Sequence, residues 1–342
     1  MKETRTSLKT EASLSAKPGL GQILLGVPAF ILRRLLFIVI LAFAIVYFCT
    51  LGMRLTVNST TNINRQALVD AARPAFNETI DFFQAAFQGE LGTVVRGVME
   101  RSTVPIGEVV ADAYVTSAQL VATGIGLAAI LGILAGGLAA TRRHSPLSLS
   151  TLTLTVIGVS IPSFFLALLL RVADIAFYRQ TGIGLVPVFS SSMDRTQSLL
   201  PTVTFPALVL AARPLAHITR VTFVSVSEIL NRDFIRTAQS KGLSRRVVFW
   251  RHTLRNAGIS ILTAAVVSLR FALGSLPVVE IFFDWPGVGS TMLNAIFAGE
   301  TRVVAAMGLA LGVTFLLINL VVDLIYRWID PRLRGSSNGR AA

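Results

Sequence analysis

The sequence has few charged residues, a single cysteine and three histidines. Only 14% of its 342 residues are charged and 53% are hydrophobic, whereas soluble domains contain about 25% charged residues. This deficit predicts an integral membrane protein. The lone Cys49 excludes a disulfide within the chain and a cysteine-based metal site. The histidines (His144, His217 and His252) are far apart in the sequence, so we expect no metal site.

The sequence also lacks the phosphate-binding loop G-x-x-x-x-G-K-[ST] of many ATPases. Lysine occurs only four times, and Lys241 precedes a glycine instead of following one. The zinc-protease motif H-E-x-x-H is absent as well. We therefore predict no catalytic residues and no cofactor bound by this chain.

What the sequence does contain is positive charge. A formal net charge of +13 would suggest a nucleic-acid partner for a soluble protein. In a membrane protein, basic loops follow instead from the preference of Lys and Arg for the cytoplasmic side. We therefore expect contact with membrane lipid and no nucleic-acid partner.

Apolar stretches long enough to cross a bilayer as helices occur six times. They predict an all-α membrane protein with spans at about 35–53, 117–140, 149–172, 199–218, 259–279 and 303–326. Pro162 predicts a kink near Val159 in the third span. Residues 1–34 form a polar tail followed by an apolar segment, residues 20–32. Gly26 and Pro28 within that segment favour a short helix at the membrane surface or a loose lead-in.

The distribution of basic residues predicts the orientation of these spans. Of the 31 Lys and Arg residues, 21 lie in the two termini and in the loops on the same side as the termini. Basic loops favour the cytoplasm, so both termini are predicted to be cytoplasmic, including the C-terminal tail, residues 327–342. The same rule places a sizeable loop, residues 54–116, outside the cytoplasm and a basic loop, residues 219–258, inside it.

Local spacing of apolar and small residues predicts two packing features. Four apolar residues at helical spacing predict an amphipathic helix in the outer loop: Phe76, Ile80, Phe83 and Phe87. In the second span, Gly132 and Gly136 have a spacing that lets two helices approach closely.

Charged residues inside membrane spans are candidates for function. Arg270 lies in the middle of the fifth span, where it either faces a water-filled translocation path or forms an interhelical ion pair or hydrogen bond. Glu280 follows about 15 Å further along a helix, so we do not expect it to pair with Arg270. For Glu280 and Asp323, which lie near helix ends, a structural role is favoured.

The basic loop contains a helix-and-turn pattern of its own. Residues 236–241 include several helix formers and are followed by Gly242, a residue typical of the position after a helix end. A polar, basic helix of this kind is not needed to hold a membrane bundle together. We therefore predict that a partner outside the membrane binds it.

This loop resembles the permease loop of binding-protein-dependent ABC importers, in the version found in the dipeptide, oligopeptide and nickel group. The resemblance rests on residues 233–244 and 251–256. Similar motifs follow the order of that group elsewhere in the chain, at residues 160–164, 279–280, 285–287, 319–323 and 330–334. With the six spans, the resemblance covers about residues 30–334.

Two departures from the family pattern occur. The general permease loop has Glu-Ala where this chain has Arg236 and Thr237, a replacement that is usual in the peptide group. The group commonly has a Pro-Gly-Asp-Pro-like segment after the first span, whereas residues 54–60 read Arg-Leu-Thr-Val-Asn-Ser-Thr. The outer loop has therefore diverged.

The resemblance implies the fold of a type I ABC importer permease, with a transmembrane domain at residues 35–326, a cytoplasmic coupling helix, and a place in a prokaryotic cell membrane. It implies an ATPase-coupling role for Asp233, Arg236, Thr237, Ala238, Lys241 and Gly242. Basic residues of the loop would meet acidic groups of the ATPase or anionic lipid: Arg232, Arg236, Lys241, Arg245 and Arg246.

The partners implied are a second, homologous permease in a heterodimer, two cytoplasmic ABC ATPases that bind ATP and Mg²⁺, and an extracytoplasmic solute-binding protein. The chain would form half of a translocation pathway for peptides or a similar small solute. One alternative is a self-sufficient secondary transporter driven by an ion gradient, which is expected to carry an internal repeat. Another is a structural assembly scaffold.

Overall fold

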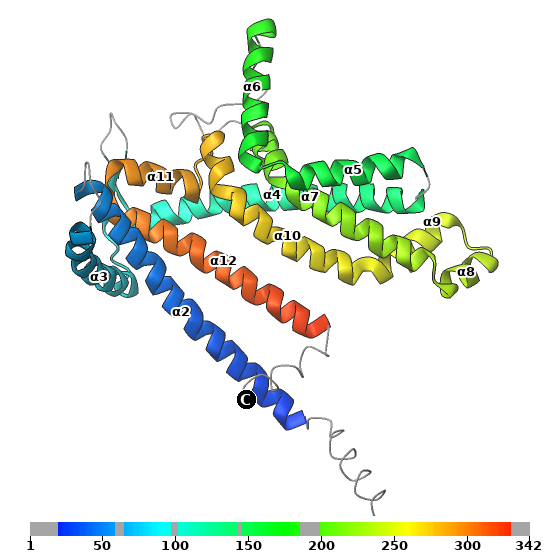
Figure 1. The fold of residues 1–342 in the computed structure, drawn as a ribbon, viewed down its shortest axis with the longest axis horizontal. Coiled ribbons are helices and arrows are strands. Elements are labelled where there is room, and N and C mark those ends of the chain that lie inside the picture. Colours follow the sequence, from blue (N-terminus) through cyan, green and yellow to red (C-terminus); the bar gives the residue numbers. More distant parts are fainter. Residues whose placement is uncertain are drawn as a thin grey trace, which may run out of the picture. The chain divides into compact units, whose positions relative to one another are not determined.

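The computed structural model describes residues 20–58, 65–96, 102–142, 145–182, 184 and 199–329. These residues form helices and one small sheet (Figure 1). The helices are α2 (Leu20–Asn58), α3 (Arg65–Gln88), α4 (Ile106–Thr141), α5 (Pro146–Ser160), α6 (Ser163–Thr181), α7 (Leu199–Leu230), α8 (Asp233–Ser240), α9 (Arg245–Val247), η2 (Val248–Leu254), α10 (Arg255–Phe282), α11 (Val288–Ala298) and α12 (Thr301–Ile329). The chain divides into two compact units, residues 1–44 and residues 45–342.

Among the described residues, five helices are long and apolar enough to cross a membrane, and a bent helix pair makes six if it is counted as one span. The five segments are Leu32–Thr56, Ile106–Thr141, Thr202–Leu230, Arg245–Phe282 and Thr301–Leu324. The prediction of an all-α membrane fold is confirmed.

The described part of the first unit is the N-terminal part of α2. This helix begins at Leu20 and continues past Pro28 without a break, whereas the sequence favours a separate surface helix or a loose lead-in at residues 20–32. A proline removes one backbone hydrogen bond from a helix, and apolar membrane helices tolerate that loss. On this helix the Arg34 guanidinium lies over the Phe37 ring, 5.9 Å from the ring centre.

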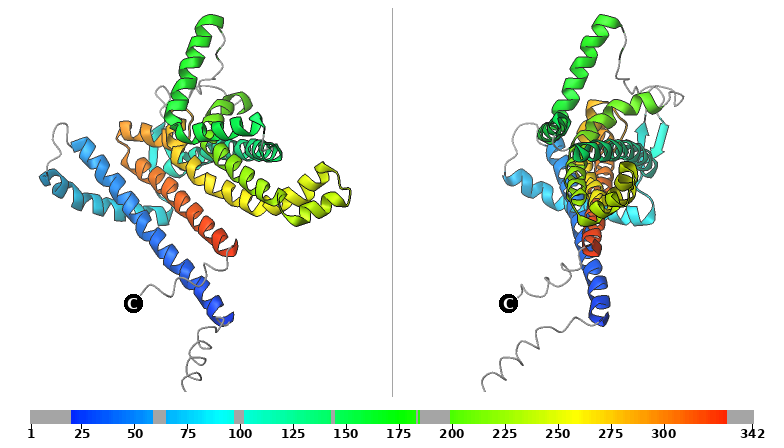
Figure 2. Two further views of the ribbon diagram at one scale, coloured as in Figure 1. Left: turned by 45° about the vertical axis from the view of Figure 1, so that its right-hand side comes forward. Right: turned by 90° about the vertical axis from the view of Figure 1, so that its right-hand side faces the viewer.

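The bent pair consists of α5 and α6, whose axes differ by 101°. Of the two residues between them, Ile161 and Pro162, Ile161 is extended, with φ −76° and ψ 123°. Pro162 lacks an N–H group and disfavours the helical conformation for the residue before it. The predicted third span, residues 149–172, is therefore divided between two helices, where the sequence predicts only a kink near Val159. Figures 1 and 2 show α6 turned sharply away from α5.

Small residues allow α4 to pack along α7. Gly124, Ala128, Gly132 and Gly136 recur every four residues of α4 and are buried. A Cβ atom on Gly136 would overlap the carbonyl oxygen of Thr219 in α7, so this approach requires glycine. The spacing of Gly132 and Gly136 therefore reflects close helix packing.

The predicted outer loop, residues 54–116, includes elements that pack onto the ends of the membrane helices. Strands β1 (Thr93–Arg96) and β2 (Ser102–Pro105) form an antiparallel hairpin with Thr93 opposite Pro105. A buried cluster joins the last part of α2 to α3, α4, α11 and α12, and includes Met53, Phe82, Ile106, Ala295 and Met307.

Within this cluster α3 is a helix, but its buried face is not the one that the apolar spacing suggests. The buried residues are Ala71, Ala75, Thr79 and Phe82. Of the four residues that define the predicted apolar face, Phe76, Ile80 and Phe87 are exposed. Two small residues and a hydrogen-bonded threonine fit closely against α2, where the Thr50 and Thr79 hydroxyl oxygens are 3.2 Å apart.

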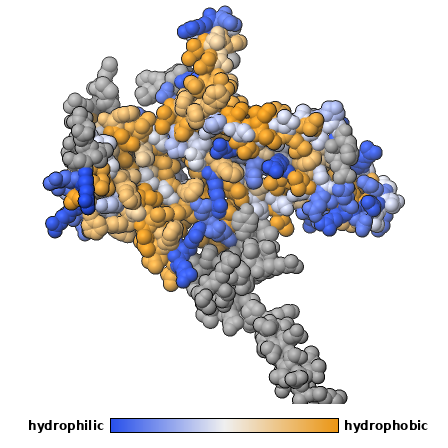
Figure 3. Space-filling view, in the orientation of Figure 1, coloured by the Kyte–Doolittle hydropathy of each residue, from blue (hydrophilic) through white to orange (hydrophobic). Residues whose placement is uncertain are grey.

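Within the second unit, the two ends of the membrane helices carry different structures. Figure 1 shows α8 and α9 at one end and α11 at the other. In Figure 3, apolar side chains cover much of the helices, and hydrophilic side chains gather over α8 and α9. The loop between α7 and α10 is thus separated from the outer loop by the length of the membrane helices.

Candidate functional site in the loop between α7 and α10

The central element of the loop is the short helix α8. It ends in a Schellman motif, in which Leu243 N–H donates to the Ala238 carbonyl at 3.3 Å and Gly242 N–H donates to the Gln239 carbonyl at 2.9 Å. Gly242 has a φ of +78°, which side-chain-bearing L-residues rarely adopt. The turn after α8 therefore depends on glycine at this position.

One face of α8 is buried and the other is exposed. Ile235 is 0% exposed, and with Ala238 it packs against Val248 of η2. On the outer side, Phe234 is 45% exposed. Among the residues predicted to couple to an ATPase, Ala238 belongs to the buried face, and the others are exposed: Asp233, Arg236, Thr237, Lys241 and Gly242.

The charged groups near α8 form only local ion pairs in the described structure. Arg236 and Asp233 are 3.6 Å apart, with side chains 75% and 96% exposed, and such exposed pairs contribute little to stability. Arg232 donates to Glu228, at the end of α7, at 2.5 Å. The outer face of α8 consequently presents an aromatic ring, hydroxyl groups and an accessible guanidinium to solvent.

The predicted loop, residues 219–258, includes the ends of both neighbouring helices. Residues 219–230 are the last turns of α7, and residues 255–258 are the first turn of α10, which leaves 231–254 between them. The apolar part of α7 ends before the helix does, so hydropathy alone places the end of the helix too early.

A continuous helical path connects the loop to α10 through α9 and η2. The turns of η2 are of the wider π type, and the buried Thr253 hydroxyl donates to the Val248 carbonyl at 3.1 Å. The Phe249 ring occupies space beside Gly137 of α4, where a Cβ atom would lie 2.9 Å from the ring. Contacts on both sides therefore fix η2, the element on which α8 rests.

Arg270 lies on α10, some turns away from this loop, and pairs with Asp323 of α12. The Nη2–Oδ1 distance is 3.7 Å, and the two side chains are 31% and 34% exposed. Of the two predicted arrangements, the structure contains the ion pair. The buried Nε atom of Arg270 has no hydrogen-bond partner among the described residues, so the guanidinium retains unused donor capacity.

The far end of α10 holds Glu280, whose side chain is completely buried. The Ser117 hydroxyl of α4 donates to one carboxyl oxygen, and Gly289 N–H of α11 donates to the other at 2.6 Å. Ser117 Oγ accepts a hydrogen bond from Val288 N–H at 2.8 Å. Buried polar groups stabilise a fold when their partners are complete, and this network joins α4, α10 and α11.

The turn after Glu280 closes around this carboxyl group. Trp285 Nε1–H donates to the Thr116 carbonyl at 3.1 Å. Cβ atoms on Gly287 or Gly289 would overlap the Glu280 carboxyl group. The Trp-Pro-Gly-Val-Gly segment is therefore a packing motif, in agreement with the structural role favoured for Glu280.

Ser117 is the important residue that the sequence does not reveal. It contacts Glu280 across 163 positions of sequence, and a lone serine in an apolar span has no distinguishing pattern. Val248, which supports α8, is equally inconspicuous among apolar neighbours.

Comparison with known families identifies the family to which the chain belongs. Residues 129–335 match the family described as the binding-protein-dependent transport system inner membrane component. The chain belongs to this family. The matched range includes α8, Arg270 and the buried turn around Glu280. Membership makes the chain a multi-pass inner membrane permease component, and it favours an ABC importer over a self-sufficient secondary transporter.

Several proteins named as transport permeases are similar to this chain over most of its length. A putative peptide permease protein of Brucella suis is 32% identical over 264 residues, which are 77% of this chain and 81% of the relative. The glutathione transport system permease protein GsiC of Escherichia coli is 33% identical over 77% of this chain and 80% of its own length. The dipeptide transport system permease protein DppB of Alkalihalophilus pseudofirmus is 29% identical over 90% and 99%.

Proposed function

We propose that this permease subunit forms half of the translocation pathway for peptides or a similar small solute, and that α8 is its contact with a cytoplasmic ATPase. The observation that carries the proposal is the two-sided packing of α8. Ile235 and Ala238 hold it against Val248, while Phe234 and Arg236 face outward. A short helix anchored on one side and exposed on the other fits a groove in a partner protein.

The packing of α8 suggests how movement would pass into the membrane. Closure of two ATPases around nucleotide would push on the outer face of α8. The buried side chains of Ile235 and Ala238 would transfer that displacement to η2, which continues into α10. Close-packed interiors transmit such displacements because they deform little, and the spans would move between outward-open and inward-open states.

The remaining partners follow from what this chain lacks. Without a phosphate-binding loop, it depends on separate ATPase subunits for ATP and Mg²⁺. A second, homologous permease would complete the pathway as a heterodimer, and a solute-binding protein would deliver the solute from outside. The basic loops favour a cytoplasmic position for both termini. The bacterial origin of the relatives favours a prokaryotic cell membrane as the location.

The identity of the solute is proposed from the relatives and from Arg270. The names of the relatives include peptides, dipeptides and glutathione, and such molecules carry carboxylates. The Arg270 side chain is 31% exposed within the membrane helices, and its Nη2 atom lies 3.7 Å from Asp323 Oδ1. A guanidinium of this kind suits transient binding of a carboxylate along the pathway.

The coupling role is tested with Gly242→Pro in the complete transporter reconstituted in liposomes. Proline fixes φ near −65°, which is incompatible with +78°, so the end of α8 is displaced. We expect a normal amount of protein in the membrane but loss of uptake and of solute-stimulated ATP hydrolysis. Gly258→Ala, at a helical position of α10 with open space around it, is the matched control.

Three outcomes would contradict the proposal. The first is uptake by Gly242→Pro at the rate of the control variant. The second is robust ATP hydrolysis by the purified chain alone, and the third is ion-gradient-driven uptake by this chain without ATPase subunits. The ligand that copurifies with the cognate binding protein would identify the solute.

A further inference from the structure

In the predicted outer loop, α3 has three faces with different surroundings. One face, which includes Ala75 and Thr79, is buried against the chain. A second face is an apolar stripe, in which Val69, Phe76 and Ile80 are exposed at helical spacing. The third face is polar and exposed: Asp70, Arg73, Asn77, Asp81 and Gln84. An exposed apolar stripe beside a polar face marks a contact with lipid or with another protein.

Two contacts with α2 show which side of α3 is directed toward the membrane. The Phe76 ring meets the Tyr47 ring edge to face, with the ring centres 6.5 Å apart. Arg54 forms an ion pair with Glu78, in which Arg54 Nε donates to Glu78 Oε2 at 2.9 Å. Arg54 is the first charged residue after the apolar run of α2, and Tyr47 lies about 10 Å before it along the helix. The side of α3 with Phe76 is therefore directed toward the apolar part of the span, and the side with Glu78 toward its polar end.

The apolar stripe is continuous with the apolar surface of the membrane helix. Figures 1 and 2 show α3 beside the last turns of α2, where Phe48 is 65% exposed and its ring meets that of Tyr47 edge to face. Aromatic side chains are enriched where a membrane helix passes from acyl chains to headgroups. Val69 and Ile80 lie within about 11 Å of Phe76 along α3, whereas Phe87 is about 16 Å away and is left outside the proposed contact.

The charges of α3 indicate which part of the membrane it contacts. Its exposed charged residues are two basic and two acidic: Arg65, Arg73, Asp70 and Asp81. Glu78 is already paired with Arg54. Because the exposed charges balance, attraction to anionic headgroups contributes little, and burial of apolar area among acyl chains would supply the binding free energy.

We propose that α3 is an interfacial helix, whose stripe of Val69, Phe76 and Ile80 inserts among lipid acyl chains beside the end of α2. The polar face remains in water. The orientation predicted from the basic loops places this contact in the outer leaflet. The predicted outer loop is then attached to the membrane surface by α3. This inference does not depend on the coupling role of α8 or on the identity of the solute.

The test places single nitroxide labels on the full-length chain in phosphatidylcholine nanodiscs, in a Cys49→Ala background. Val69→Cys and Ile80→Cys report on the stripe, and the adjacent Asp70→Cys and Asp81→Cys are matched controls on the polar face. Oxygen concentrates among acyl chains, whereas a neutral nickel chelate stays in water, so the relaxation of each label by the two reagents measures its surroundings. We expect the labels at 69 and 80 to be accessible to oxygen and to lose access to the nickel chelate. The labels at 70 and 81 should show the reverse.

Access of the nickel chelate to either stripe position at the level of the adjacent control would show that the stripe lies in water, and would overturn the proposal. Exclusion of both reagents from positions 69 and 80 would overturn it as well, because a second copy of the chain would then cover the stripe. The two stripe positions are about 16 Å apart along α3, so the expected result at both cannot come from a local distortion by one label.

Discussion

At the scale of single residues, the carboxyl group of Glu280 occupies space that two glycines leave open. A Cβ atom at position 287 would overlap this carboxyl group and the Ser117 hydroxyl. We expect Gly287→Ala to destabilise the protein by about 1–3 kcal/mol, the usual effect of overpacking. Thermal unfolding in detergent measures the change. Gly274→Ala on α10, where nothing lies within 4 Å, should be neutral or slightly stabilising.

Arg270 offers a second test at this scale. If it binds a solute carboxylate, Arg270→Gln should raise the half-saturation concentration for uptake about tenfold and leave basal ATP hydrolysis unchanged. Asp323→Asn removes the same ion pair while keeping the guanidinium, so it should have a much smaller effect. Equal effects of the two substitutions would indicate a structural ion pair only.

At the scale of elements, α3 shows that the periodicity of apolar residues predicts a helix but not the face that the helix buries. The spacing of four apolar residues predicts a helix, and α3 is helical, but the contacts use Ala71, Ala75 and Phe82. Periodicity identifies the element, whereas the buried face depends on which side chains fit against α2 and α12. The shape of those partners is not encoded in the local pattern.

Substitution of two phenylalanines of α3 tests which face of this helix is buried. Phe82 is 3% exposed and Phe87 is 90% exposed. Phe82→Ala should lower the free energy of unfolding by about 3–5 kcal/mol because it leaves a cavity. Phe87→Ala should change it by less than about 0.5 kcal/mol. Similar effects for both would place the buried face of α3 elsewhere.

At the same scale, Pro162 accounts for the division of the third predicted span. A proline inside an apolar run predicts a kink, because it removes a hydrogen bond and restricts the preceding residue. The angle of 101° between α5 and α6 depends in addition on contacts that α6 makes with α7 and α10. Those contacts involve residues far along the chain, so the sequence alone does not give the angle.

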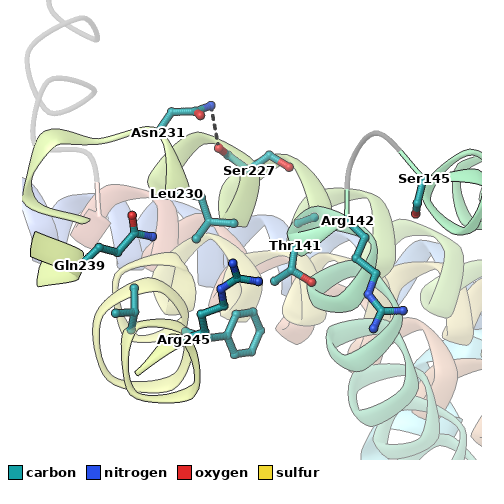
Figure 4. Close-up of a pocket in the computed structure, with 11 residues that line it drawn as sticks. Thr141, Arg142, Ser145, Ser227, Leu230, Asn231, Gln239 and Arg245 are labelled. Carbon is teal, nitrogen blue, oxygen red and sulfur yellow. Dashed lines mark hydrogen bonds between the residues drawn. The ribbon is translucent and has the colours of Figure 1, made fainter. Parts of the chain in front are cut away.

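At the scale of the whole molecule, the order of apolar runs predicts the all-helical membrane fold, and the motif at residues 233–244 indicates the family. The network of Glu280, Ser117 and Gly289 could not be predicted in the same way. Neither could the cavity of about 690 Å³ beside Arg245, at the end of α4 and between α7, α8 and α9 (Figure 4), because its lining comes from several separate segments. Both require the packing of helices that are adjacent in space but not in sequence.

The orientation of the molecule is tested by labelling with a membrane-impermeant maleimide. In a Cys49→Ala background, Phe87→Cys should react in intact cells, because residue 87 is exposed and belongs to the predicted outer loop. Ser240→Cys, at the end of α8, should react only after the membrane is permeabilised. The reverse pattern would invert the predicted topology.

The π-type turns of η2 affect how α8 is rotated about the helix axis relative to α10. Each residue of an α-helix advances the chain by about 100°, and a π-turn accommodates one residue more than an α-turn. Deleting one residue of η2 would let the segment close into an ordinary α-helix, while rotating Val248 by about 100° relative to Arg270. For a deletion after Val248, the contact between Val248 and Ile235 would persist, but α8 would be turned relative to α10 although every other side chain of the loop remained. The number of residues in η2 thus sets the orientation of α8 relative to α10, the helix through which a displacement of α8 would reach the membrane.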